Sequence, residues 1–209
     1  MDLRQQRTRR SIVNAFLALR SEKPIEKITV RELTERAQIH KATFYLHYHD
    51  IYDLSEALEW EVIDDILHGL SDPASLLTDP DRFNEELYCL LMAHESLLGL
   101  LFSGSRAGML AARLERRLKD YIFERHPSYR DDLEKNVVLT YLIHGAYHAY
   151  MQYRDHDPKA VLLIIDRMAA SVLKRYTAAD PAETPPTEAS PDAPAAPSDS
   201  PGMAVSGNI

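Results

Sequence analysis

The 209-residue chain has one cysteine, one tryptophan and only seven glycines. A single cysteine excludes an internal disulfide and a cysteine-rich zinc site. Because Cys89 lies in an apolar run, we expect its thiol to be buried and unreactive. No segment alternates for long between apolar and polar residues, so the sequence does not indicate strands.

Long apolar runs are also missing. A membrane-spanning helix needs about 20 predominantly apolar residues, and charged or histidine side chains interrupt every apolar stretch of this chain. Residues 1–22 are basic and then apolar, but no small-residue cleavage site of a secretory signal follows them. We therefore expect a cytoplasmic protein with no membrane partner.

Residues 177–209 lack lysine, arginine and aromatic residues, and they contain seven of the twelve prolines and five carboxylates. Such a segment cannot bury enough apolar surface to offset the entropy lost on ordering. We predict a disordered, acidic tail rich in proline and alanine, preceded by a folded body.

Charge is distributed unevenly along that body. Residues 1–48 hold ten Lys and Arg against five Asp and Glu, whereas residues 49–176 hold 14 against 22. The first segment therefore has a net charge of +5 and the second a net charge of -8. A basic head attracts polyanions even though the whole chain is acidic, so a nucleic-acid partner is not excluded.

The apolar residues recur at the spacing of amphipathic helices, which predicts an all-α fold of about nine helices. We divide the chain into a helix-turn-helix head at 1–50, a helical bundle at 51–176 and the tail at 177–209. The expected helices cover about 5–21, 30–36, 40–46, 51–70, one segment from near residue 81 to about 102, 106–125, 130–155 and 158–176.

Two short helices joined by a turn of about three residues form the predicted helix-turn-helix. Thr29 precedes Glu32 by three residues, which is the spacing of a capping box and predicts a helix start near residue 30. The turn at 37–39 leads to the second helix, at about 40–46. The small core shared by the two helices is predicted to contain Leu33, Ala37, Ile39 and Phe44.

The segment AQIHKATFYLHYHD, residues 37–50, suits a surface that contacts DNA. Lys41 can reach a base acceptor or a phosphate, Thr43 can touch a thymine methyl group, and the ring of Tyr45 can pack on the sugar-phosphate wall. The predicted DNA-contacting residues are Thr29, Arg31, His40, Lys41, Ala42, Thr43, Tyr45, His47, Tyr48 and His49.

The histidines raise the alternative of a metal site. His40 and His47 are two helical turns apart, too far for one ion. His144 and His148, four residues apart, share a helix face, but two ligands are too few unless His94 or Glu95 joins them. We expect no metal and no cofactor.

Tyrosines surround the His144 and His148 pair in the sequence. An apolar cavity with a few hydroxyl and imidazole groups is typical of a small-molecule site, and the same residues also fill helix-bundle cores. The candidate ligand-binding residues are Tyr88, His94, Tyr121, Tyr141, His144 and His148, with core packing as the alternative for each.

Residues 8–56 resemble the DNA-binding head of the tetracycline-repressor (TetR) family of bacterial transcription regulators. The resemblance is carried by RSIVNAFLALRSEKPIEK followed by ITVRELTERAQIHKATFYLHYHDIYDL. The segments HESLLGLLFS, RLKDYIFER and YLIHGAYHAYMQY are similar in plan to the ligand-sensing and dimerising domain of that family. Within it, the chain is most similar to regulators related to the dihydroxyacetone-kinase operon activator.

The resemblance implies a homodimeric transcription regulator, most often a repressor, that places residues 40–46 in the major groove of a pseudo-palindromic operator. An effector bound in the body would shift the population of DNA-binding dimers. Small residues of the last two helices would permit close approach, and larger apolar ones would supply contact area. The implied dimer-interface residues are Gly145, Ala146, Ala149, Leu162, Ile165, Met168 and Val172.

Three residues depart from the family pattern. Gln38 stands where the family usually has glycine, so the turn must adopt either a strained left-handed residue or another turn geometry, at a cost of about 1 kcal/mol. His40 replaces a small N-cap residue, and imidazole is a poorer cap. Ile51 replaces a lysine that in the family often meets phosphate, so one anchor to the DNA backbone would be missing.

Two other classes of function stay open. The body could bind a partner protein instead of a small molecule, as the resemblance to the kinase-operon branch allows. A helical enzyme using His144 and His148 with a metal is the third class. The sequence shows no nucleophile paired with a base and no phosphate loop, so we do not expect an enzyme.

Overall fold

A computed structural model describes residues 3–177, and side chains as far as Lys174. The predicted all-α fold is confirmed: this part of the chain forms nine α-helices and four short 3-10 helices, without a strand. Over the same residues, none of the helices combines the length and apolar character that crossing a membrane requires. The predicted tail at 177–209 lies, except for Thr177, outside the described residues.

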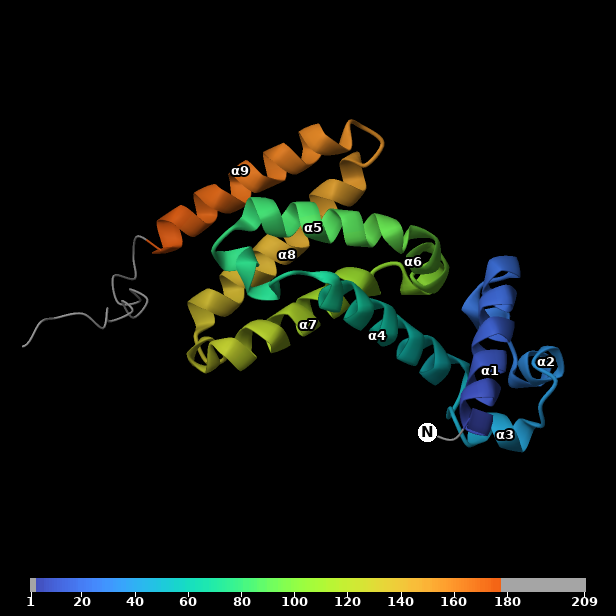
Figure 1. The fold of residues 1–209 in the computed structure, drawn as a ribbon. Helices are drawn as coiled ribbons and strands as arrows, with labels where there is room; N and C mark the ends of the chain where they lie inside the picture. Colours follow the sequence, from blue (N-terminus) through green and yellow to red (C-terminus); the bar gives the residue numbers. More distant parts are fainter. Residues whose placement is uncertain (1–2, 178–209) are drawn as a thin grey trace, which may run out of the picture.

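The helices form a small head at one end of an elongated body (Figure 1). The head contains α1 (Leu3–Glu22), η1 (Ile25–Lys27), α2 (Val30–Arg36) and α3 (Lys41–Tyr45). The connecting helix is α4 (Ile51–Gly69). The body contains η2 (Pro73–Leu77), α5 (Pro80–Ala93), α6 (Glu95–Leu101), η3 (Gly104–Arg106), α7 (Met109–Arg125), η4 (Pro127–Tyr129), α8 (Leu133–Tyr153) and α9 (Pro158–Thr177).

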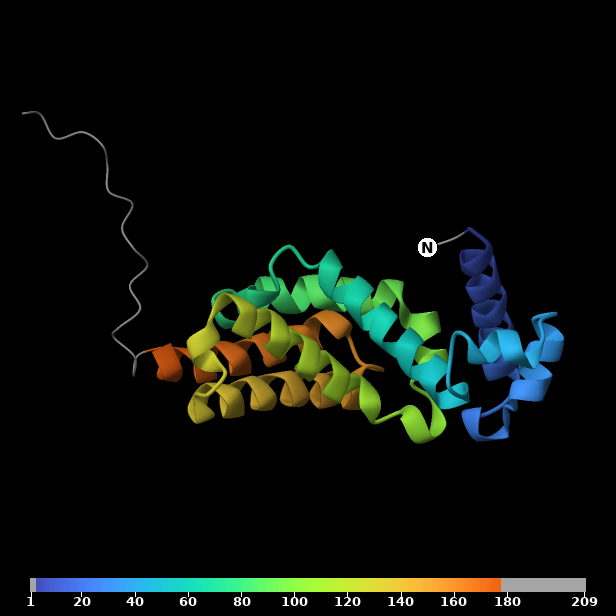
Figure 2. The same ribbon diagram turned by 90° about the horizontal axis from the view of Figure 1, so that it is seen from below.

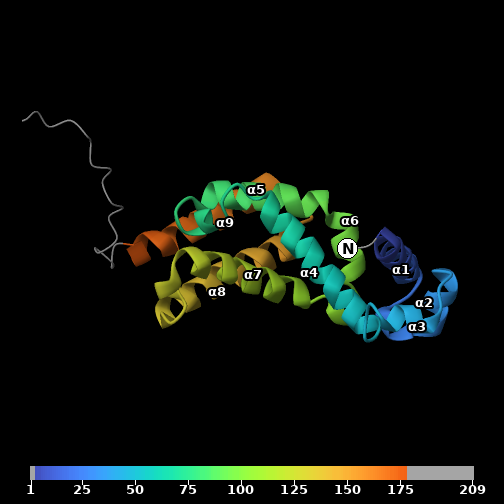
Figure 3. The same ribbon diagram turned by 60° about the horizontal axis from the view of Figure 1, so that its bottom comes forward.

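Helices α8 and α9 run antiparallel along the body, and α9 ends at the extremity farthest from the head (Figures 1 and 2). Figure 3 shows α4 running obliquely from the body to the head, with α6 beside its head-proximal half. Because α6 contacts both α1 and α4, it is the part of the body nearest to the head.

Side-chain caps explain where several helices begin. The Thr29 hydroxyl accepts a hydrogen bond from the Glu32 backbone N–H at 3.3 Å, which confirms the predicted start of α2. Aspartate carboxylates cap other helices in the same way, each accepting from a backbone N–H in the first turn. These are Asp50 of α4, Asp79 of α5, Asp132 of α8 and Asp157 of α9.

One predicted helix is wrong in its extent, because the segment from near residue 81 to about 102 is two helices, not one. His94 ends α5 and begins α6, with φ of -105° and ψ of 8°. Its ring Nδ1 lies 2.8 Å from the carbonyl oxygen of Leu90, so the imidazole occupies a position beside the backbone where the helix is interrupted.

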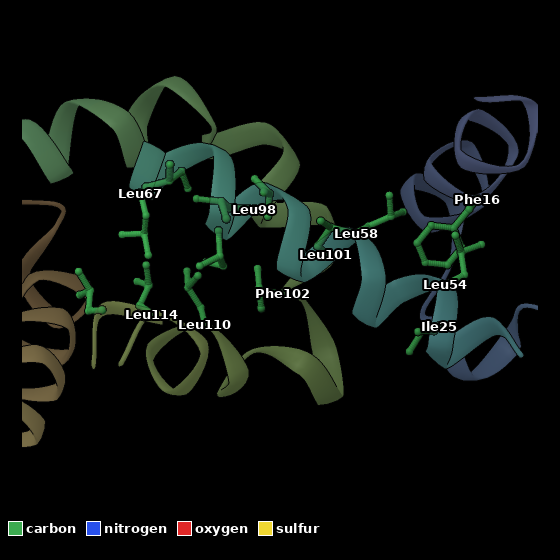
Figure 4. Packing of buried hydrophobic residues seen from close by; sticks show 14 of the residues in the cluster. Phe16, Ile25, Leu54, Leu58, Leu67, Leu98, Leu101, Phe102, Leu110 and Leu114 are labelled. Carbon is green, nitrogen blue, oxygen red and sulfur yellow. The ribbon is translucent and has the colours of Figure 1, made fainter. Parts of the chain in front are cut away.

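One apolar core extends from the head into the body along α4. In the head, Phe16 and Ile25 pack with Leu54, and farther along α4 Leu67 packs among side chains of the body (Figure 4). Ile51 is only 5% exposed and belongs to this core. At position 51, where the resemblance implies a lysine, the first turn of α4 therefore has a core residue.

The expectation for Cys89 is wrong. The thiol is exposed on α5, because position 89 lies outside the stripe through which Phe83 and Leu87 face the core. An apolar run in a helix includes residues of every face, so the run alone could not place the cysteine.

Candidate nucleic-acid interface

The turn between α2 and α3 adopts the first of the two expected geometries, with a left-handed residue at position 38. Gln38 has φ of 53°, in the left-handed region that favours glycine. His40 occupies the N-cap of α3 and makes no side-chain capping hydrogen bond. Gln38 is therefore an unfavourable residue for its turn, and His40 is an unfavourable residue for its cap. Both lie directly before the helix that is predicted to contact DNA.

The short helix α3 is fixed to the head by its inner face. Phe44 is fully buried and Tyr48 is 7% exposed, with ring centroids 5.9 Å apart. Ala42, Tyr45 and Leu46 are exposed to solvent. Ala42 and Leu46 lie on the side of the helix away from Phe44, whereas Tyr45 lies between the two sides. The result is a rigidly held helix with one exposed side.

Nine of the ten predicted DNA-contacting residues reach the surface. Thr43 and His47 are half-buried, and seven others are exposed: Thr29, Arg31, His40, Lys41, Ala42, Tyr45 and His49. Tyr48 is the exception, and its assignment to the DNA surface does not fit the structure. Its ring is part of the core, and burial raises the pKa of its phenol.

Two of the exposed residues are already engaged within the head. Arg31 Nε lies 2.8 Å from Glu35 Oε1, one turn along α2. The Thr29 oxygen accepts the capping hydrogen bond, which leaves its hydroxyl proton available to a phosphate oxygen. On α1, Arg7 and Arg10 are exposed, whereas Arg9 pairs with Glu61 of α4.

Leu46 was not among the predicted DNA-contacting residues, although it is 84% exposed directly after α3. A signal was present in the sequence: on a helix, position 46 lies about 200° from both Phe44 and Tyr48. Once those two rings are assigned to the core, Leu46 has to point outward.

A buried ion-pair network lies where the head joins the body, and the sequence analysis did not identify it. The fully buried carboxylate of Glu59 accepts hydrogen bonds from Arg106 Nη2 at 2.6 Å, Arg113 Nε at 2.8 Å and Ser55 Oγ at 2.9 Å. The carboxylate raises the pKa of Arg106. The network ties α4 to η3 and α7.

Arg20 connects the head to the body directly. Its Nη2 donates to the Leu100 carbonyl and to Ser103 Oγ, both at 2.6 Å, from the end of α1 to the end of α6. The side chain is 5% exposed, and burial lowers the pKa of its guanidinium. The orientation of α1 therefore depends on the position of the segment between α6 and η3.

The body contains a small apolar cavity of about 70 Å³. Side chains of η2, α5, α7, α8 and α9 line it, and the polar ones are Asn84, Tyr88, Tyr147 and Tyr150. Asn84 Nδ2 donates to Asp166 Oδ1 at 2.7 Å, and the rings of Tyr88 and Tyr150 meet edge to face with centroids 5.5 Å apart. No charged side chain lines the cavity, which favours an uncharged occupant.

Of the predicted ligand-binding residues, the structure brings only Tyr88 to this cavity. His94 lies at the junction of α5 and α6, and the ring of Tyr121 lies beside His68. Tyr141 and His148 are exposed on α8. These four residues and His144 do not line the cavity, whereas Tyr147 and Tyr150, two of the tyrosines that surround the histidine pair in the sequence, do.

His144 and His148 have ring centroids 6.0 Å apart, but a carboxylate of α7 engages the first of them. His144 Nε2 lies 2.9 Å from Glu115 Oε2, and the other oxygen of Glu115 accepts from Thr140 at 2.5 Å. Among the described residues, no group of three or more His, Cys, Asp or Glu side chains is positioned to hold a metal ion.

The implied dimer interface is only partly on the surface. Ile165 is 9% exposed and lines the cavity together with Leu162 and Ala146. Ala149 and Val172 are half-buried, whereas Gly145 and Met168 are exposed. The large apolar residues of the two last helices that are more than half exposed are Leu133, Val137, Tyr141, Tyr153, Leu163, Ile164 and Met168.

The spacing of the buried residues along α9 explains why part of the implied dimer interface is not exposed. Its buried residues recur every four positions, at Val161, Ile165, Ala169 and Leu173. Ile164 and Met168 come three residues after Val161 and Ile165, at the edge of this buried stripe, and both are more than half exposed. We call the exposed set Val137, Tyr141, Ile164 and Met168 the outer apolar face.

Comparisons with protein-family models, with curated proteins and with solved structures found no match to this chain. The interpretation of the site therefore depends on its own geometry and on the resemblance of its helix-turn-helix residues.

Proposed function

We propose that the protein is a homodimeric, TetR-type transcription regulator that binds a pseudo-palindromic operator and acts as a repressor. The observation that carries the proposal is the exposed side of α3, where Lys41 and Tyr45 project from a helix held by Phe44. Residues 36–49 contain no carboxylate, so this surface does not repel a polyanion. The net charge of +5 over residues 1–48 has the same effect.

A dimer is the second element of the proposal. The outer apolar face leaves large side chains in water, and a second copy related by a two-fold axis would bury them. Two heads in one dimer would contact half-sites about 34 Å apart, or at a compatible spacing, on one side of the duplex.

An effector is the third element. The uncharged lining of the cavity suits a neutral, apolar molecule, but about 70 Å³ is much less than the roughly 300–1,000 Å³ of ordinary ligand pockets. An effector would have to spread α5, α8 and α9. The movement would reach the head through α6 and the contacts of Arg20 with Leu100 and Ser103.

The small cavity also favours a second candidate, a regulator whose body binds a partner protein. Thermal-shift measurements with neutral, apolar compounds distinguish the two candidates. A rise in melting temperature that is lost in Ala146→Leu, a substitution that fills the cavity, would support the small-molecule effector. No shift with any compound, together with one stoichiometric protein partner, would support the second candidate.

DNA binding is tested with a duplex covering the region upstream of the protein's own gene. We expect salt-dependent binding that is weakened by Lys41→Ala and by Tyr45→Ala, with the salt slope reduced by about 1 in the lysine variant. Matched controls are Lys159→Ala and Tyr153→Ala, since both residues are exposed on the body far from α3. A folded protein that binds this duplex no better than random DNA would contradict the proposal.

A further inference from the structure

Leu46 is the most exposed large hydrophobic side chain in the described part of the chain, at 84%. It follows α3 with φ of -74° and ψ of -18°, so it continues the helical path. Ala42 lies four residues earlier and Tyr45 one residue earlier, and both are exposed. Residues four apart share a helix face, so Ala42 and Leu46 present their apolar groups on the same side.

Single exposed apolar residues are common on proteins and need no explanation by themselves. Leu46 differs because of its surroundings. It is on the basic head, in the segment 36–49 that contains Lys41 and no carboxylate, and it lies between the buried residues Phe44 and Tyr48 in the sequence. A surface that combines positive charge with a rigid apolar side chain fits the floor of a DNA major groove.

In the major groove, the base edges offer donors, acceptors and one apolar group, the C5 methyl of thymine. The outer side of α3 has few donors besides Lys41 and the Tyr45 hydroxyl. Its apolar groups therefore match thymine better than cytosine, guanine or adenine.

We propose that α3 reads a thymine through contact of Leu46 and Ala42 with the thymine methyl group. The proposal rests on the DNA-binding function proposed above and specifies what its recognition helix selects. The helix rises about 1.5 Å per residue, so Leu46 lies about 7.5 Å beyond Lys41, which is about two base-pair steps of 3.4 Å. We expect the selected thymine about two base pairs from the guanine or phosphate that Lys41 contacts.

The test begins with the full chain and a pool of random-sequence duplexes, from which bound DNA is selected and sequenced. Each thymine of the selected half-site is then replaced in turn by deoxyuridine, which removes only the C5 methyl group. Affinities are measured for the original protein, for Leu46→Ala, and for Leu46→Met as the conservative variant. Because Leu46 is exposed, neither substitution should change the fold, and circular dichroism checks this.

We expect one position at which deoxyuridine weakens binding about fourfold, the effect of one buried methyl group. In Leu46→Ala the same replacement should weaken binding less than twofold, because the partner of the methyl group is gone. Leu46→Met should keep the difference between thymine and deoxyuridine.

Three results would overturn the inference. The first is a selected half-site in which no deoxyuridine replacement changes the affinity. The second is a Leu46→Ala loss of equal size on thymine and deoxyuridine duplexes, since that would place Leu46 on the sugar-phosphate backbone. The third is a selection that enriches no sequence at all, and only this one also contradicts the proposed function.

Discussion

Gln38 is the only non-glycine residue in the described backbone with a positive φ, at 53°. An amino acid with a Cβ loses roughly 1–2 kcal/mol in this conformation relative to the right-handed helix, and glycine does not. We predict that Gln38→Gly raises the free energy of unfolding by about 1 kcal/mol, measured by urea denaturation.

Gln6→Gly is the matched control for this prediction. Gln6 is exposed within α1, where glycine lowers stability by about 1 kcal/mol through its unfolded-state entropy. The same substitution should therefore have opposite signs at the two positions. A loss of stability in Gln38→Gly would show that the turn does not hold residue 38 in a left-handed conformation.

The residues in and after α3 show which burial states could be predicted from the sequence. The motif placed Lys41, Tyr45 and Phe44 correctly as two exposed residues and one core residue. Tyr48 was predicted to contact DNA, but a tyrosine suits a core as well as a groove. Tyr48 lies one turn after Phe44, and its ring packs against the ring of Phe44. This contact places Tyr48 in the core.

At the scale of elements, the contact between α7 and α8 contains a carboxylate with a strongly shifted pKa. Burial raises the pKa of Glu115, but hydrogen bonds from Lys119, Thr140 and His144 outweigh burial and hold the pKa at about 2. Because the folded pKa is below the unfolded value of about 4.3, Glu115 stabilises the fold above pH 4. This contribution is lost as the pH falls toward 2.

We predict that Glu115→Gln lowers the free energy of unfolding by roughly 1–2 kcal/mol near pH 6. The difference from the unsubstituted protein should shrink steadily below pH 4 and disappear near pH 2, as followed by urea denaturation at a series of pH values. Glu124→Gln, at an exposed position of the same helix, should leave the pH profile parallel to that of the unsubstituted protein. A constant difference at every pH would rule out a protonation-linked role for Glu115.

Most of the helices were predicted from local features of the sequence. Helix-period apolar spacing and side-chain caps predicted the helices, and the Thr29 cap confirmed one boundary directly. The break at His94 could not be predicted, because leucines continue on both sides of it. Whether an apolar helix runs straight or bends there depends on the neighbouring helices that pack against it.

At the scale of the whole molecule, Glu59 joins three elements from a fully buried position. Removing its charge would take from Arg106 and Arg113 the buried carboxylate that they share, and would leave Arg113 with only the exposed Glu56. We predict that Glu59→Ala lowers the free energy of unfolding by about 3–5 kcal/mol. The single tryptophan, Trp60, reports the transition, since its ring lies 4.4 Å from the Arg113 guanidinium.

Glu56→Ala is the control, because the exposed Glu56 pairs with the same Arg113 at 3.2 Å. An exposed ion pair contributes about 0–1 kcal/mol, so we expect a loss within that range. Similar losses in the two variants would mean that burial does not distinguish the two carboxylates.

The outer apolar face carries the last prediction. Ile164 is 61% exposed, so Ile164→Glu should leave the helical content unchanged while converting a dimer into a monomer, as measured by analytical ultracentrifugation. Met109→Glu alters an exposed apolar residue of α7 and should leave the dimer intact. A protein that remains dimeric in Ile164→Glu would place the interface elsewhere.

The sequence by itself determined the helical fold, the helix-turn-helix and the charge difference between head and body, because periodicity, caps and charge are local properties. The tertiary structure decided which side of a helix is buried wherever the apolar pattern allowed more than one. It therefore placed Leu46 and Ile164 in solvent, Tyr48 and Ile165 in the interior, and the carboxylate of Glu59 between two arginines. These outcomes depend on contacts between residues far apart in the chain, and no local pattern encodes the partner of such a contact.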